Sequence, residues 1–144
     1  MERAEKRLRL HAPGGPPEGR VSLLHGSLTY RDERWAAANA AALVEVIEHL
    51  DPDRLPLVER VVFGEARPGA VVVTTPNAEY NVLFPNLAAG RFRHRDHRFE
   101  WTRAEFRSWA ERIGAVYGYR AEFSGIGTND KALGSPTQMA VFTR

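Results

Sequence analysis

The chain has 144 residues, of which 43% are hydrophobic, 26% charged and 10% aromatic, as is typical of one soluble globular domain. It contains no cysteine, which excludes disulfides, thiolate zinc sites and iron–sulfur clusters and fits a cytoplasmic location. No apolar run approaches the roughly 20 residues of a membrane-spanning helix, so we expect no membrane partner. The net charge is +2, and 18 arginines with only two lysines carry the positive charge.

The predicted elements alternate between helix and strand along the chain. A basic helical pattern over 4–10 and a glycine- and proline-rich loop over 11–19 precede a short apolar strand over 21–25. A second strand is predicted over 40–46, followed by a helix that begins at Asp51 and Pro52. The β-branched run 70–74 predicts a parallel strand covered on both faces.

The second half continues the pattern after a long loop over 76–101, a length that is usually functional or disordered. Thr102 and Glu105 form a capping box, which predicts a helix that ends at Gly114. Two further strands are predicted over 116–123 and 138–143. The alternation favours an α/β sandwich with a largely parallel sheet.

A group of metal-ligating side chains lies where the second predicted strand ends. In open α/β sheets, ligands bind beyond the carboxyl ends of the strands. If the chain turns helical there, Glu45, Glu48 and His49 share one face and can ligate a divalent metal. The alternative is a helix start with acidic residues near its dipole and a solvated histidine.

The long loop carries a cluster of basic residues. His94 and His97 can supply a further metal ligand, and the mixed oxygen and nitrogen set then suits manganese, iron, cobalt or zinc better than magnesium. The alternative is that these histidines face phosphate or solvent. The arginines between 91 and 98 can neutralise RNA or DNA phosphates, although such a run is also typical of a solvated surface.

Two other segments carry side chains suited to binding. Asn77 and Asn81 can orient a hydroxyl, and Tyr80 can stack on a base or sugar. The alternative is a turn capped by asparagine, which would have the same residues. Gly26 follows a predicted strand and lets the backbone approach a planar ligand closely.

Five blocks of sequence resemble, in order and spacing, the small-RNA 3′-terminal ribose 2′-O-methyltransferases of the HEN family, and specifically their bacterial RNA-repair branch. The blocks are GSLTYRD (26–32), LVEVIEHLD (43–51), TPNAEYN (75–81), RHRDHRFEWTRAEF (93–106) and PTQMAVFTR (136–144). The resemblance covers nearly the whole chain from residue 21. It implies the Rossmann-like fold of class I S-adenosylmethionine-dependent methyltransferases, which is an α/β sandwich.

The resemblance also implies a reaction and a set of site residues. The substrate would be an RNA 3′ end with a free 2′,3′-diol, methylated on the 2′-hydroxyl with S-adenosylmethionine as donor and one divalent metal, magnesium or manganese. The implied roles by position are metal ligands Glu45, Glu48, His49 and His97, with His49 or His97 as proton acceptor; donor contacts Gly26 and Ser27; and substrate contacts Asn77, Tyr80, Asn81, Arg93 and Arg95. An RNA kinase–ligase is the expected repair partner.

The chain departs from the family pattern at its amino-terminal end. It has neither the glycine-rich turn after the family's first strand nor the acidic residue that ends its second strand, and Asn39 stands where the family has an aspartate. We therefore expect one methyltransferase domain over 1–144 that lacks its first two strands, with 1–20 as a residual helix and loop. The strand at 21–25 would then have lost its neighbours.

Two other functions fit parts of the sequence. A non-catalytic fragment that binds RNA 3′ ends would keep the metal and the arginine loop without holding the donor. A metal-dependent hydrolase built on the EXXEH motif would need no methyl donor.

Overall fold

The computed structural model describes residues 2–10, 12–17, 19–36 and 38–144, so the predicted loop over 11–19 has two positions, 11 and 18, outside the described residues. In chain order, the helices and strands are α1 (Glu2–Leu8), β1 (Ala40–Val44), α2 (Leu55–Glu59), η4 (Arg60–Ala66), β2 (Ala70–Pro76), α3 (Arg103–Tyr117), β3 (Arg120–Ile126) and β4 (Thr137–Thr143). Short 3-10 turns also occur, including η2 (Ile47–His49) and η5 (Ala78–Leu83). The segment η4 is a π-helix that continues α2 directly.

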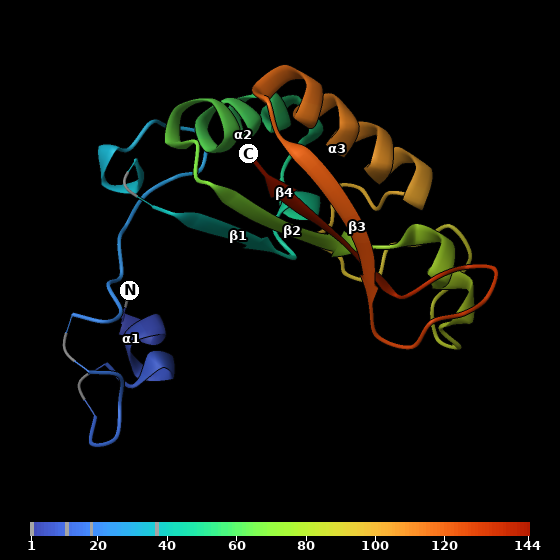
Figure 1. Ribbon diagram of the computed structural model, residues 1–144. Coiled ribbons are helices and arrows are strands. Elements are labelled where there is room, and N and C mark those ends of the chain that lie inside the picture. The colour runs from blue at the N-terminus through green and yellow to red at the C-terminus, as the bar shows by residue number, and fades with distance from the viewer. Residues whose placement is uncertain (1, 11, 18, 37) are drawn as a thin grey trace.

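The four strands form one mixed sheet in the order β1-β2-β4-β3 (Figure 1). β1 is parallel to β2, with Leu43 opposite Val73. β4 is antiparallel to both of its neighbours, so that Ala140 lies between Val73 and Phe123. The expected parallel direction is therefore confirmed for β1, β2 and β3 and is wrong for β4.

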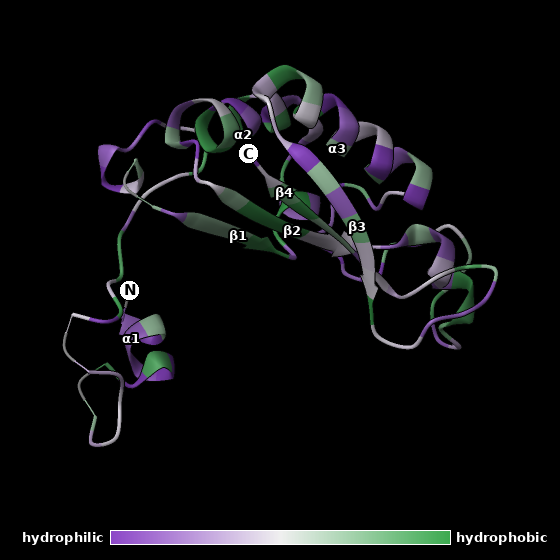
Figure 2. Ribbon diagram, in the orientation of Figure 1, coloured by the Kyte–Doolittle hydropathy of each residue, from purple (hydrophilic) through white to green (hydrophobic). Residues whose placement is uncertain are grey.

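The described helices α2, η4 and α3 cover one face of the sheet (Figure 1). On that face Val71, Val73 and Phe142 are fully buried, and the ring of Phe63 from η4 meets the ring of Phe142 edge-on at 4.9 Å. Figure 2 shows β2 and β4 as hydrophobic and α3 as alternately hydrophobic and hydrophilic, which is the pattern of a helix with one buried side.

The opposite face of the sheet is only partly covered within the described part of the chain. Val44 is 59% exposed and Val72 is half-buried. The expectation that the strand at 70–74 is covered on both faces is wrong, because the helices that pack against the sheet, α2, η4 and α3, all lie on the same side.

The predicted strand at 21–25 is absent. This segment has no regular structure, and its Val21 and Leu24 are exposed. A short apolar run forms a strand only when it pairs with a neighbouring edge, and among the described residues β1 pairs with β2 alone. Helix α1, which has no buried residue, lies apart from the sheet (Figure 1).

Helix α3 begins with the predicted capping box of Thr102 and Glu105, which is confirmed. The helix does not end at Gly114 but continues to Gly118, whose φ of 77° is left-handed. Gly114 is nevertheless required, since a Cβ there would lie 2.5 Å from the carbonyl oxygen of Tyr119. The glycine marks the place where the chain folds back over the helix end. No helix within the described ranges is long and apolar enough to cross a membrane.

A buried carboxylate joins α2 to α3. Glu59 is 4% exposed and accepts hydrogen bonds from Trp109 Nε1 at 2.8 Å and from both terminal nitrogens of Arg112 at 3.0 and 2.8 Å. We expect Glu59→Ala to lower the free energy of unfolding by about 2 kcal/mol, because the indole N–H would stay buried without an acceptor. Urea unfolding followed by tryptophan fluorescence would measure the loss.

The matched control is Glu111→Ala on α3, whose side chain is 62% exposed and faces Arg107 at 3.9 Å. We expect this control to change stability by less than about 0.5 kcal/mol. Equal losses in the two variants would contradict the role assigned to Glu59.

Candidate functional site

Glu45 follows the last residue of β1 and is held by the end of β2. Its backbone lies in the left-handed region, with φ of 52°, which is uncommon for a residue other than glycine. Its N–H donates to the carbonyl oxygen of Thr74 at 3.2 Å and to Thr74 Oγ1 at 3.1 Å. Thr74 Oγ1 in turn donates to Glu45 Oε1 at 2.9 Å. Thr74 therefore fixes both the backbone and the carboxylate of Glu45.

Glu48, in the turn η2, is a fully buried carboxylate. Its Oε2 accepts a hydrogen bond from Thr75 Oγ1 at 3.0 Å, and its Oε1 has no hydrogen-bond partner among the described residues. Burial raises the pKa of Glu48, and the neighbouring charge of Glu45 raises it further. A buried carboxylate oxygen without a donor costs free energy that a bound cation would offset. The residues present therefore fit a divalent metal.

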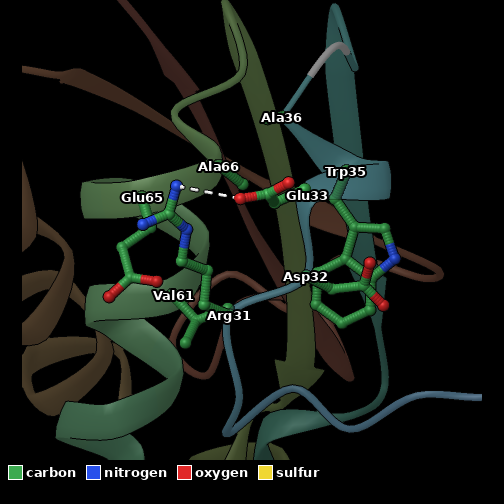
Figure 3. A pocket seen from close by; sticks show the side chains of 8 residues that line it. All are labelled: Arg31, Asp32, Glu33, Trp35, Ala36, Val61, Glu65 and Ala66. Carbon is green, nitrogen blue, oxygen red and sulfur yellow. Dashed lines mark ion pairs between the residues drawn. The ribbon is translucent and has the colours of Figure 1, made fainter.

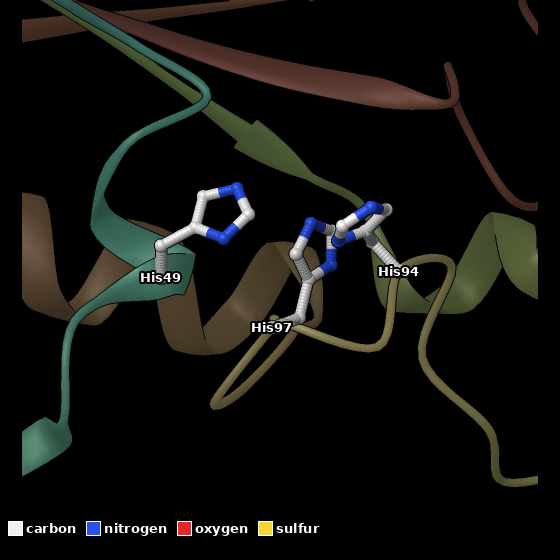
Figure 4. Close-up of side chains that lie close together, drawn as sticks. All are labelled: His49, His94 and His97. Atoms are coloured by element: carbon white, nitrogen blue, oxygen red, sulfur yellow. The ribbon is translucent and has the colours of Figure 1, made fainter.

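Three histidines converge on the same place (Figure 4). His49 ends η2, whereas His94 and His97 come from the loop before α3, and one ligand nitrogen from each lies within 4.8 Å of the others. The ring of His97 is nearest to that of His49, with centroids 4.8 Å apart. The charge of His97 also acts on Glu48. Among the described residues, the side chains close enough to share one metal ion are these three histidines, and Glu45 and Glu48 do not belong to that group. Glu48 lies near enough to Glu45 and His97 for their charges to act on it, and the ligand set Glu45, Glu48, His49 and His97 stays a prediction.

Glu100 organises the loop side of this site. Its side chain is fully buried, and its Oε1 lies 2.6 Å from His97 Nδ1 and accepts from the backbone N–H of Arg93 at 2.7 Å. Its Oε2 accepts from the amide nitrogen of Asn81. The carboxylate orients His97 through Nδ1 and leaves Nε2 available, which is the arrangement of a metal-ligating histidine and its supporting carboxylate.

Thr74, Thr75 and Glu100 were not expected from the sequence as site residues. The two threonines end a buried strand, and Glu100 follows His97 by three residues in the block that resembles the family. Polar residues beside a predicted ligand were the available signal, but only the fold shows that they hold the ligands.

Two of the expected substrate contacts have other roles. Both amide hydrogens of Asn77 are used inside the protein, on the carbonyl oxygens of Leu133 and Ser135 at 2.8 and 2.9 Å, and its Oδ1 accepts from the N–H of Glu79. The expectation that Asn77 orients a substrate hydroxyl is not supported, because this fully buried side chain anchors the loop before β4.

Arg93 is likewise held within the protein. Its Nε donates to Asn81 Oδ1 at 2.6 Å, its Nη2 donates to the carbonyl oxygen of Asn77, and its guanidinium lies 4.9 Å from the centre of the Phe84 ring. Burial lowers its pKa. The expected contact between Arg93 and RNA is therefore corrected to a structural role, whereas the side chain of Arg95 is 90% exposed and lies 3.8 Å from the Asp96 carboxylate.

Tyr80 and Asn81 lie in η5, the turn that follows β2. Tyr80 is half-buried and its ring meets that of Phe84 at 5.7 Å. Asn81 and Glu100 line an open cavity of about 350 Å³, which is also lined by the loop that includes Leu87 and Phe92. This cavity adjoins the carboxylate that orients His97.

The two residues expected to contact the methyl donor do not line an enclosed pocket. Gly26 and Ser27 are exposed, a Cβ on Gly26 would lie 3.1 Å from the Trp35 ring, and the Ser27 hydroxyl lies 2.9 Å from that of Thr29. A nearby cavity of about 260 Å³ lies between residues 31–36 and η4 and contains the ion pair of Arg31 and Glu33 (Figure 3). Neither Gly26 nor Ser27 lines it. The residues expected to hold S-adenosylmethionine thus do not by themselves fit it.

Known proteins resemble the chain in both sequence and structure, although no protein-family model matches it. The small RNA 2′-O-methyltransferase of Mus musculus is 45% identical over 127 residues, which are 86% of this chain and 31% of that protein. The solved methyltransferase domain of bacterial CtHen1 is 48% identical, with a TM-score of 0.86, and the match covers 99% of this chain and 72% of that chain. The chain belongs to the Hen1 methyltransferase family.

A second solved Hen1 structure is also similar to this chain, with lower sequence identity than the CtHen1 domain. The solved small RNA methyltransferase HEN1 is 35% identical, with a TM-score of 0.77, over 83% of this chain and 15% of that chain. The mixed α/β sheet is therefore that of the Hen1 methyltransferase domain. The chain spans about a third of the length of the first curated relatives that it matches.

Proposed function

We propose that the chain takes part in transfer of a methyl group from S-adenosylmethionine to the 2′-hydroxyl of the 3′-terminal ribose of RNA. The proposal rests on membership of the Hen1 family and on one observation of the site. Glu48 is fully buried, its Oε1 has no partner among the described residues, and His97 lies close enough to influence its charge. Glu45, Glu48, His49 and His97 would hold one magnesium or manganese ion.

The reaction requires that the 2′-hydroxyl lose its proton, and a bound divalent metal would supply the charge that lowers the pKa of the hydroxyl. The chain's own residues would position the reacting groups. Thr74 and Thr75 hold the two glutamates, and Glu100 holds His97 by its Nδ1 atom. His49 and His97 were the expected proton acceptors, but each ring faces an oxygen acceptor through Nδ1 and would use Nε2 on the metal, so neither has a lone pair for the proton, which would pass to solvent.

The substrate would be a single-stranded RNA end with a free 2′,3′-diol. Tyr80 and Asn81 would contact the terminal nucleotide: Asn81 donates to Glu100, which holds His97, and the cavity of about 350 Å³ lined by Asn81 has room for part of a nucleotide. The exposed Arg95 would contact the RNA backbone. An RNA kinase–ligase is the proposed partner in repair, as in the family's bacterial branch.

A second function is favoured by the exposure of Gly26 and Ser27. A chain that holds the metal and the RNA end but not the donor would act as an RNA 3′-end binding module. This alternative shares the metal ligands and the loop arginines with the first proposal and differs only in donor binding.

One experiment separates the two functions. The chain would be incubated with manganese, radiolabelled S-adenosylmethionine and RNAs that end in a 2′,3′-diol, a 2′-deoxyribose or a 2′-O-methylribose. Label on the diol RNA alone is the expected result. Diol-dependent RNA binding without label would support the binding module, and the absence of both label and binding would contradict both proposals.

A further inference from the structure

The backbone of Asp96 contacts two of the three histidines with opposite polarity. Its carbonyl oxygen lies 3.3 Å from His49 Nδ1, and its N–H donates to His94 Nδ1 at 3.2 Å. A carbonyl oxygen only accepts and an amide N–H only donates. His49 therefore carries a proton on Nδ1, whereas Nδ1 of His94 is an unprotonated acceptor.

His97 matches His49 rather than His94. Its Nδ1 faces Glu100 Oε1 at 2.6 Å, and that carboxylate also accepts hydrogen bonds from Arg93 and Asn81. Because Glu100 is surrounded by donors, Nδ1 of His97 carries the proton.

These contacts divide the histidines into two chemical types. A neutral imidazole carries one proton, so His49 and His97 have a free lone pair on Nε2, as a metal ligand requires. His94 carries its proton on Nε2, which makes that atom a hydrogen-bond donor and not a ligand. The carboxylate of Asp96 does not alter this, since its Oδ2 lies 3.7 Å from His94 Nδ1, beyond hydrogen-bond range.

We propose that His94 is a substrate-binding residue that donates its Nε2–H to the phosphate of the 3′-terminal nucleotide of RNA, and that it does not ligate the metal. The inference rests on the proposed function. The His94 side chain is 55% exposed and His49 is also exposed, whereas the side chain of His97 is 8% exposed, so His94 lies on the open side of the histidine cluster. The next residue, Arg95, is 90% exposed and pairs through Nε with the Asp96 carboxylate at 3.8 Å, and its remaining guanidinium N–H groups can donate to a phosphate.

The first test reads the tautomers directly and needs neither metal nor RNA. Long-range ¹H–¹⁵N correlation spectra of the metal-free chain would be recorded at mildly alkaline pH, where imidazoles are neutral. We expect His94 to be protonated on Nε2 and His49 and His97 on Nδ1. The same tautomer in all three rings would overturn the assignment of His94 to a different tautomer from His49 and His97.

The second test uses manganese alone as the probe. Calorimetric titration would compare the wild-type chain with His94→Ala and His97→Ala, with circular dichroism as a check on folding. We expect His94→Ala to stay within about threefold of the wild-type affinity and His97→Ala to lose more than about tenfold. A tenfold loss in His94→Ala would make it a metal ligand and overturn the proposal.

The third test measures binding of a short single-stranded RNA with a 3′-terminal diol in the presence of manganese. We expect His94→Ala to bind about tenfold more weakly, and His94→Gln to recover most of that loss because a glutamine amide can donate from a position close to Nε2. With an RNA that carries a neutral methylphosphonate before its last nucleotide, the difference between wild type and His94→Ala should fall to about twofold or less, since the acceptor has lost its charge and one of its two non-bridging oxygens.

The outcomes separate this inference from the function on which it rests. A wild-type chain that binds manganese but not the RNA would contradict the proposed function. Wild-type RNA binding that His94→Ala leaves unchanged would contradict the assignment of His94 alone. A tenfold effect of His94→Ala that persists in full with the methylphosphonate RNA would contradict a hydrogen bond from His94 to the charged terminal phosphate.

Discussion

Glu48→Gln is expected to weaken manganese binding by more than about 100-fold and to raise the free energy of unfolding of the metal-free chain by about 1 kcal/mol. Glu48 is fully buried, and its Oε1 has no partner among the described residues. A neutral amide of the same shape removes the cost of burying the charge and keeps an acceptor for the Thr75 hydroxyl. The residue is therefore unfavourable for the metal-free fold and favourable for the metal complex.

The direction of the pH dependence follows from the raised pKa of Glu48. Because the folded chain prefers the neutral carboxyl, this group stabilises the fold below its ordinary pKa, and the contribution is lost as pH rises through the raised pKa. We expect the metal-free wild type to lose stability over that interval and Glu48→Gln to lose less. Manganese affinity of the wild type should rise over the same interval, since the metal needs the ionised carboxylate.

Thermal unfolding with and without manganese over a pH series would measure these effects. Glu122→Gln is the matched control, because its side chain is 71% exposed on β3. It should keep the manganese-induced rise in Tm and show no gain in metal-free stability. If Glu48→Gln still shows the full rise in Tm with manganese, the assignment of Glu48 as a metal ligand is wrong.

Glu100→Gln is expected to weaken manganese binding by about 10- to 100-fold and to lower the free energy of unfolding by about 2 kcal/mol. The two carboxylate oxygens accept from His97, Arg93 and Asn81, and an amide replaces one of these acceptors with a donor. Either a buried donor loses its acceptor or His97 reverses its tautomer and puts a proton on Nε2. Either change would disturb the metal site, although Glu100 itself is not assigned as a metal ligand.

Calorimetric titration with manganese and urea unfolding would separate the two effects in Glu100→Gln. Glu33→Gln provides the control, since that side chain is 87% exposed and only 3.6 Å from Arg31 in a surface ion pair. The spectra that report imidazole tautomers would show whether His97 has changed. Wild-type manganese affinity in Glu100→Gln would mean that His97 is oriented by other contacts.

Local pattern was sufficient for much of the fold. The capping box at Thr102, the β-branched run of β2 and the apolar run of β1 each correspond to a structural element. The strand at 21–25 was wrong because strand formation depends on a paired edge, which apolar residues alone do not supply. The end of α3 was wrong because Gly114 serves a close approach of Tyr119 and not a turn.

The sequence also limited the candidate site to a small set of residues, but only as far as residue type and spacing allow. The EXXEH spacing predicted Glu45, Glu48 and His49 as ligands, and the resemblance selected His97, whose ring centroid lies 4.8 Å from that of His49. The role of Asn77 was misjudged because residue identity does not distinguish an asparagine that orients a ligand from one that anchors a loop. Its partners Leu133 and Ser135 lie more than 50 residues away along the chain.

The sequence by itself determined the family, because membership depends on the identity and order of residues. The tertiary structure alone decided which polar atoms are satisfied. It left Oε1 of Glu48 without a partner, gave Glu100 three donors and placed the Asp96 backbone between His49 and His94. Hydrogen-bond partners distant in the chain set burial, charge and tautomer, and these properties exist only after the chain has folded.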